Sequence, residues 1–118
     1  MSSRKGPFKL VTVNTSPDRA QRLIGRLIDA LKADYDITHV ANCQSIEEVV
    51  AKVTAHKPNV LISASMWTSD EAGNIQALAR SVVPDIQTHA IPTGLQVERG
   101  PDAIVEYLIE RVPRLLDT

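Results

Sequence analysis

Short apolar runs alternate with amphipathic stretches along the chain, and this alternation limits the possible folds more than any other feature. The runs of strand length are residues 8–14, 35–43, 59–65 and 85–91. Each run precedes a stretch in which apolar residues recur every three or four positions, which is the period of an amphipathic α-helix. Strands that alternate with helices at this spacing form a parallel sheet covered by helices on both faces, with right-handed crossovers.

Capping signals mark where three of the predicted helices begin. They are Ser16 followed by Pro17, the pair Ser45 and Glu48, and the pair Thr68 and Glu71. A serine or threonine side chain accepts a hydrogen bond from a free N–H of the first turn, and a glutamate three residues later completes a capping box. Pro58 and Pro84 close the second and third helices.

The C-terminal part of the chain carries the weakest signals. Residues 93–99 are either a loop or a short fifth strand around Leu95–Val97. The last helix follows Pro101 and is expected to end or kink at Pro113, because a proline lacks an N–H and clashes one turn back.

We therefore predict one α/β domain over residues 1–118, with residues 1–7 flexible. Its architecture is a three-layer α/β/α sandwich around a parallel four-stranded sheet in the flavodoxin-like order 2-1-3-4, or five-stranded if residues 93–99 add a strand.

Charge and cysteine content exclude several classes of protein. The formal net charge is −1 and the basic residues are scattered, which argues against a nucleic-acid surface. Cys43 is the only cysteine, so an internal disulfide is excluded and a reducing cytoplasm is expected. No apolar run approaches the ~20 residues that span a bilayer, and the first run is too short and polar for a signal peptide. We expect no membrane or nucleic-acid partner.

Small polar residues follow the predicted strands, where ligands bind in parallel α/β sheets. The predicted ligand-binding residues are Asn14, Thr15, Ser16, Arg19, Ser63, Ser65, Trp67 and Thr93. Hydroxyls, an amide and helix N-termini favour a small anionic ligand. No glycine-rich phosphate loop or dinucleotide fingerprint is present. The alternative is that these residues only cap helices and turn the chain.

Other reactive residues lack partners in the sequence. Cys43 precedes a helix, where a thiolate would be favoured, yet His39 is only loosely placed to act as its base, so a buried or incidental thiol is expected. The three histidines are far apart in the chain, which argues against a shared metal site. Trp67 either lines a pocket, covers one or meets a partner, or packs within its own domain.

Two stretches, "KLVTVNTSPDRAQRLIGRLIDAL" and "YDITHVANCQSIEEVVAKVTAHKPNVLIS", resemble response-regulator receiver domains. The likeness covers Phe8 to about Val83 and is strongest in "HKPNVLIS". It implies that the family's acidic pair for magnesium falls at Asn14 and Thr15, and its phospho-accepting aspartate at Ser63.

None of these positions holds a carboxylate, so the resemblance implies a degenerate receiver without metal, cofactor or aspartyl phosphorylation. Thr93 is the candidate for the family's hydroxyl residue. The family's lysine before a proline has no counterpart, since Gly100 precedes Pro101.

The four-unit α/β pattern also looks like the cytoplasmic B subunits of sugar phosphotransferase systems. That family phosphorylates a cysteine directly after the first strand. Here the corresponding loop is "NTSPD", which excludes phosphoryl relay by that route.

Three functions follow from these observations, in order of preference. The first is a non-catalytic receiver-like signalling module that acts through a protein partner or as a homodimer. The second is a carrier of a small anionic ligand at the strand ends. The third is an enzyme whose active site is not recognisable, with Ser63, Ser65 and Cys43 as suspects.

Overall fold

A parallel four-stranded sheet in the order β2-β1-β3-β4 runs through the middle of the molecule. The computed structural model describes residues 4–117 and places the strands at β1 (Lys5–Val13), β2 (Tyr35–Cys43), β3 (Val60–Ser63) and β4 (Gln87–Ala90). The predicted parallel sheet and its strand order are confirmed.

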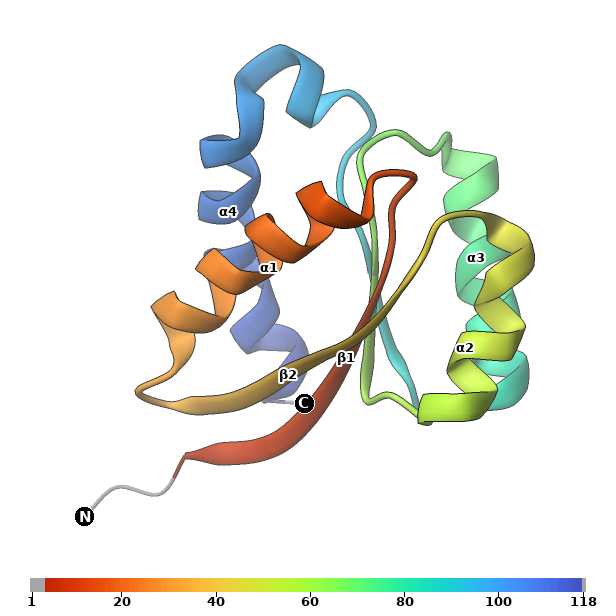
Figure 1. Cartoon of the computed structure of the whole chain (residues 1–118), viewed down its shortest axis with the longest axis horizontal. Coiled ribbons are helices and arrows are strands. Elements are labelled where there is room, and N and C mark those ends of the chain that lie inside the picture. Colours follow the sequence, from red (N-terminus) through yellow and green to blue (C-terminus); the bar gives the residue numbers. More distant parts are fainter. Residues whose placement is uncertain (1–3, 118) are drawn as a thin grey trace.

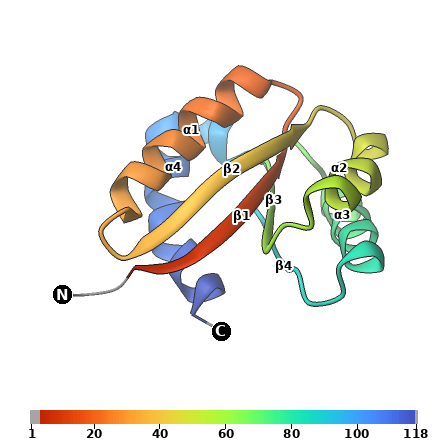
Figure 2. The ribbon, with the colours of Figure 1, turned by 60° about the horizontal axis from the view of Figure 1, so that its bottom comes forward.

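Helices cover both faces of this sheet (Figures 1 and 2). They are α1 (Pro17–Leu31), α2 (Val49–His56), which follows the 3₁₀ turn η1 (Ile46–Glu48), α3 (Ser69–Val82) and α4 (Leu95–Leu116). Helices α1 and α4 pack together on one face, and α2 and α3 on the other. The predicted three-layer sandwich is therefore confirmed.

The sheet separates two hydrophobic layers, and neighbouring strand residues face opposite layers. Leu10 and Ile62 pack with α1 and α4, whereas Val11 and Leu61 pack with α2 and α3. These strand residues are at most 2% exposed. Leu10–Val13 of β1 and Val60–Ser63 of β3 are buried on both faces, so these stretches are mostly apolar rather than alternating.

Two of the predicted helix caps are present and one is absent. The Ser16 hydroxyl accepts from the N–H of Arg19 at 3.4 Å, and Thr68 forms a reciprocal capping box with Glu71. Ser45 makes no capping bond, so that predicted box is wrong. The chain enters α2 through η1 instead, and the Glu48 carboxylate accepts from the N–H of Gln44 at 3.3 Å.

The fifth strand considered for residues 93–99 does not form, because Leu95–Val97 begin α4. Gly94 takes a left-handed conformation (φ 86°), and its N–H donates to the carbonyl of Ser65. This turn directs the chain away from the sheet. Leu95 then packs on the core while Val97 is 91% exposed, so a helix produces the alternation that suggested a strand.

Of the two outcomes predicted at Pro113, an end of the helix is wrong, because α4 continues to Leu116, and a kink stays a prediction. Its one interior break is at Gly100, with φ 83° and ψ 179°. Buried Val112 and Leu116 hold the last turns on the core. The hydroxyl of Tyr35 and the ammonium of Lys5 both donate to the carboxylate of Asp117, which fastens this end of the helix to the start of the sheet.

Strand β1 begins at Lys5, before the predicted start at Phe8. The flexibility expected for residues 1–7 stays a prediction, and residues 1–3 lie outside the described part of the chain. Within residues 4–117, no helix is both long and apolar enough to cross a membrane.

Replacement of two helix glycines by alanine should change the free energy of unfolding in opposite directions. A Cβ at Gly25, inside α1, would meet no atom within 4 Å, whereas Gly100 has a positive φ. We expect Gly25→Ala to raise the free energy of unfolding by about 0.5–1 kcal/mol, because alanine is the better helix former. Gly100→Ala should lower it by roughly 1 kcal/mol, because the methyl group disfavours positive φ. Urea unfolding of both variants checks this, and a destabilised Gly25→Ala would contradict it.

Candidate functional site

Seven of the eight predicted site residues come from the loops at the carboxyl ends of β1, β3 and β4 or from the end of β3, as expected for a parallel sheet. The chain segments after these strands lie at the same end of the sheet, in the upper part of Figure 1. Arg19 belongs to the first turn of α1. The question is whether the polar groups there are free to hold a ligand.

Hydrogen bonds tie the loop after β3 to the loop after β4. The hydroxyl of Thr93 donates to the carbonyl of Trp67 at 2.6 Å. The hydroxyl of Ser65 accepts from the N–H of Gln96 at 3.3 Å, and the carbonyl of Ser65 accepts from Gly94 at 3.0 Å. The polar groups of Ser65 and Thr93 therefore hold the two loops together.

Trp67 is the link between the β3 loop and β1. Its indole N–H donates to the carbonyl of Val13 at 2.9 Å, and its ring is half-buried against the layer formed with α2 and α3. Of the two alternatives for Trp67, the structure favours packing within its own domain.

The loop after β1 is closed in a similar way. The side-chain oxygen of Asn14 accepts from the N–H of Ser16 at 2.8 Å, and the Ser16 hydroxyl caps α1. Thr15 donates from its hydroxyl and its N–H to the sulfur of Met66, at 3.1 and 3.4 Å. The guanidinium of Arg19 makes no hydrogen bond or ion pair with the described residues, so only the backbone N–H of Arg19, which donates to Ser16, connects it to this loop by a polar contact.

Ser63 differs from the other hydroxyl residues of the set. It is the last residue of β3, is fully buried, and has the only buried side-chain oxygen or nitrogen in residues 4–117 without a hydrogen-bond partner. Leu61 packs with α2 and α3, and side chains alternate along a strand, so Ser63 faces the same layer. Its hydroxyl is therefore directed into the protein interior rather than toward the loops.

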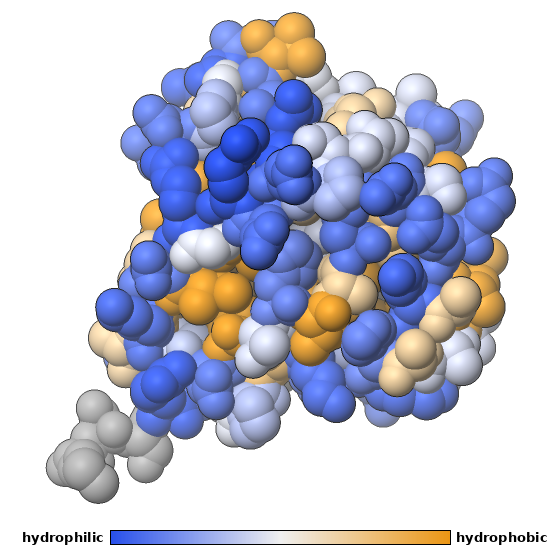
Figure 3. All heavy atoms as spheres, in the orientation of Figure 1, coloured by the Kyte–Doolittle hydropathy of each residue, from blue (hydrophilic) through white to orange (hydrophobic). Residues whose placement is uncertain are grey.

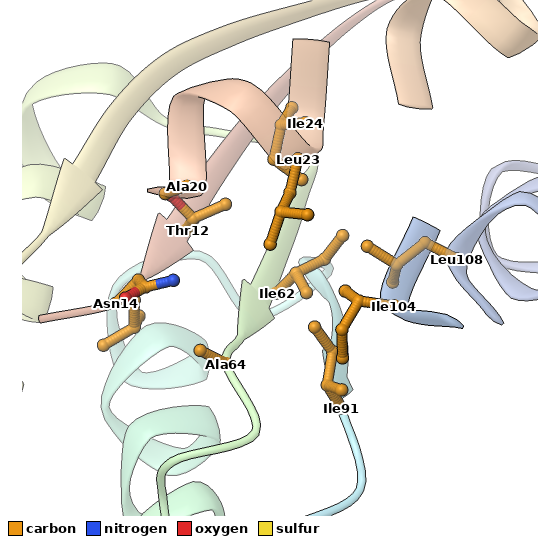
Figure 4. A pocket seen from close by; sticks show the side chains of 11 residues that line it. Thr12, Asn14, Ala20, Leu23, Ile24, Ile62, Ala64, Ile91, Ile104 and Leu108 are labelled. Carbon is orange, nitrogen blue, oxygen red and sulfur yellow. The ribbon is translucent and has the colours of Figure 1, made fainter. Parts of the chain in front are cut away.

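A small cavity lies on the other face of the sheet, between α1, α4 and the ends of β1 and β3 (Figure 4). Its volume is about 20 Å³, which is room for roughly one water molecule. Apart from Thr12 and Asn14, its walls are apolar side chains such as Leu23, Ile62 and Ile104. A cavity of this size does not accommodate a metabolite.

A polar network across β1 and β2 was not predicted from the sequence. The hydroxyl of Thr12 donates to the side-chain oxygen of Asn42 at 2.7 Å, and the Asn42 amide donates to the carbonyl of Asn14 at 3.0 Å. Thr12 also lies 2.8 Å from Nε2 of His39, which must be the donor because the threonine proton is already committed. The sign of this network in the sequence is that Thr12 and Asn42 are polar residues within the two predicted strands, and the structure pairs them with each other.

Nε2 of His39 and Nε2 of His89 each lie at a hydroxyl group, that of Thr12 and that of Tyr107, and the Cys43 thiol is buried. Burial lowers the pKa of His39, and burial together with Arg111 lowers the pKa of His89. Burial raises the pKa of the Cys43 thiol to about 11. Within the described residues, no three His, Cys, Asp or Glu side chains gather as a metal-binding group. The ligand-binding role of the eight residues stays a prediction.

Substitutions of Ser63 test how much its buried hydroxyl contributes to the stability of the fold. We expect Ser63→Ala to leave the free energy of unfolding unchanged or to raise it by up to about 1 kcal/mol, because the lost hydroxyl has no partner. Ser63→Asp should lower it by about 3 kcal/mol or more, because it buries an unpaired carboxylate. Ser69→Asp, at the exposed start of α3, is the matched control and should have little effect. A well-folded Ser63→Asp protein would contradict this assignment.

Cys43 should react slowly with alkylating reagents. The thiolate is the nucleophile, and a pKa of about 11 leaves the thiol protonated at pH 8. Iodoacetamide modification followed by mass spectrometry should be slow at pH 8 in the folded protein and fast after unfolding in urea. Equal rates in the two states would show that the thiol is accessible and ionised.

Comparisons with known proteins place the fold but not the activity. No protein-family model and no curated protein matches the chain. Among solved structures it is similar to the signal receiver domain of the response regulator NarL from Mycobacterium tuberculosis. The TM-score is 0.63 at 12% sequence identity, and the match covers 96% of this chain and 98% of that one. The chain therefore has a receiver-like α/β fold.

Proposed function

We propose that this chain is a non-catalytic, receiver-like module that acts through contact with a protein, either a second copy or another partner. The observation that carries the proposal is the chemistry at the ends of β1 and β3. Asn14, Thr15 and Ser63 occupy the positions to which the resemblance assigns the receiver carboxylates, and all three are uncharged.

Phosphoryl transfer to an aspartate needs a carboxylate as acceptor and a magnesium ion held by oxygen ligands. Ser63 could form only a phosphate ester, and its hydroxyl is fully buried. Asn14 and Thr15 direct their side chains to Ser16 and Met66. These contacts support a module that does not perform receiver chemistry.

The same contacts make a ligand carrier the weaker alternative. Ser16 and Thr68 fill the N-termini of α1 and α3, where an anion would otherwise bind. Ser65 and Thr93 are engaged in holding the loops together. A set of loops tied in this way forms a preorganised surface, which loses little conformational freedom on meeting a protein. A cytoplasmic location and a role in signalling are parts of this proposal.

The proposal predicts that the protein does not accept a phosphoryl group. The folded chain is incubated with acetyl phosphate and Mg²⁺, with an active receiver domain treated in parallel as the positive control. Intact-mass measurement under neutral conditions should show a phosphoryl adduct on the control only. A stoichiometric adduct on this chain, lost when Ser63 is replaced by Ala, would overturn the proposal.

A further inference from the structure

An open cavity lies at the end of the sheet opposite to the loops described above. Its volume is about 260 Å³, and it is formed by the segments that lead into β3 and β4, by Phe8 of β1 and by the last turn of α4. Figure 1 shows this end of the sheet in the lower part of the molecule. Since a water molecule takes up roughly 30 Å³ in the liquid, the cavity has room for a small metabolite. None of the eight predicted site residues lines it.

The side of the cavity next to β3 carries hydrogen-bond donors. Lys57 and Asn59 line it from the segment just before β3. The Lys57 ammonium forms no ion pair or hydrogen bond with any of residues 4–117. The side-chain oxygen of Asn59 accepts from the N–H of Lys9 at 2.8 Å, so the amide N–H groups of Asn59 are left for a ligand. An ammonium and an amide donor on one wall match a carboxylate.

The side of the cavity next to β4 carries a carboxylate. Asp85 lines it just before β4 and, in the part of the chain that the structure describes, has no ion-pair or hydrogen-bond partner. Because Val60 pairs with Gln87, Lys57 and Asp85 precede neighbouring strands, yet they form no ion pair with each other. Neighbouring strands are about 4.8 Å apart, so one small molecule that carries both charges can reach both residues.

Apolar residues form the remaining wall. Phe8, Leu115 and Leu116 line the cavity and belong to the hydrophobic layer formed with α1 and α4. The next residue, Asp117, is paired with Lys5 at 2.7 Å, so its carboxylate is already neutralised. The cavity therefore offers donors on one side, an acceptor on another and an apolar wall between helix and sheet.

Backbone hydrogen bonds hold the polar residues in place. The N–H of Asn59 donates to the carbonyl of Lys9, and the carbonyl of Asn59 accepts from the N–H of Gln87, both at 2.9 Å. The N–H of Lys57 donates to the carbonyl of Val53 at 2.8 Å. A site whose backbone is already ordered loses little conformational freedom when a ligand binds.

We propose that this cavity binds an α-amino acid with an aliphatic side chain. The ligand carboxylate accepts from Lys57 and Asn59, and the ligand ammonium donates to Asp85. The aliphatic side chain packs against Phe8 and Leu115. By contrast, the face shown in Figure 3 is mostly hydrophilic and carries only small, separated hydrophobic patches. The cavity is at the other end of the sheet from the loops that support the proposed function, so the two proposals are independent.

Isothermal titration calorimetry and amide NMR spectra with L-leucine test the site. We expect saturable binding of one molecule per chain. Two analogues that each lack one charge should bind about tenfold more weakly or worse, because each leaves a charged residue of the cavity without its counterpart. They are 4-methylpentanoate, which lacks the ammonium group, and 3-methylbutylamine, which lacks the carboxylate.

Charge-removing variants assign the two polar contacts. Lys57→Met should weaken the binding of L-leucine about tenfold and leave that of 3-methylbutylamine unchanged, because the amine has no carboxylate. Asp85→Asn should weaken L-leucine similarly and leave 4-methylpentanoate unchanged. Lys32→Met, a matched change at the exposed end of α1, should have no effect. Lys57 and Asp85 are exposed, so both variants should keep the circular dichroism spectrum of the folded protein.

Three results would each overturn the proposed site. They are the absence of saturable L-leucine binding up to millimolar concentrations, equal affinity for L-leucine and its singly charged analogues, and undiminished L-leucine binding by Lys57→Met and Asp85→Asn. None of them bears on the proposed function, which fails only if the chain accepts a phosphoryl group.

Discussion

Burial of β3 and of the second half of β1 on both faces is the constraint on which the rest of the structure depends. Adjacent residues of each strand enter different hydrophobic layers, as Leu10 and Val11 do in β1. The helices must therefore divide between the two faces, with α1 and α4 on one and α2 and α3 on the other. The parallel strands then end together at one edge, where three loops meet and support one another.

The neutral side chains at that edge find their hydrogen-bond partners within the protein, so they need no ligand. Carboxylates at the same places would not. Asn14 turns the chain by accepting from Ser16, and Thr93 and Trp67 use their polar hydrogens on backbone carbonyls. Two carboxylates held as close as these loops would repel each other unless a cation lay between them. The uncharged residues there do not repel one another, and they supply no carboxylate as a metal ligand. The loops at this edge of the receiver-like fold are therefore held together by their own hydrogen bonds.

Similarity to a receiver domain at 12% identity shows how little of the sequence the scaffold requires. Apolar residues with the right period and helix caps such as Thr68 suffice for the layers, whereas the chemistry depends on a few loop positions. This chain has the layers, and it carries Asn14, Thr15 and Ser63 at the positions to which the resemblance assigns the receiver carboxylates. Its C-terminal segment also forms a helix where a fifth strand was considered, so no strand among residues 4–117 pairs with the outer edge of β4.

The sequence by itself determined the strands, the helices and the three layers, because hydrophobic period and capping residues such as Ser16 act within a few positions of the chain. It could not decide residues 95–97, since three alternating residues fit a strand or a helix, and the turn at Gly94 with the packing of Leu95 resolved them. It also could not show whether the predicted site was free. The partners that occupy Trp67 and Thr93 lie 54 and 26 residues away, and only the tertiary structure brings them within hydrogen-bonding distance.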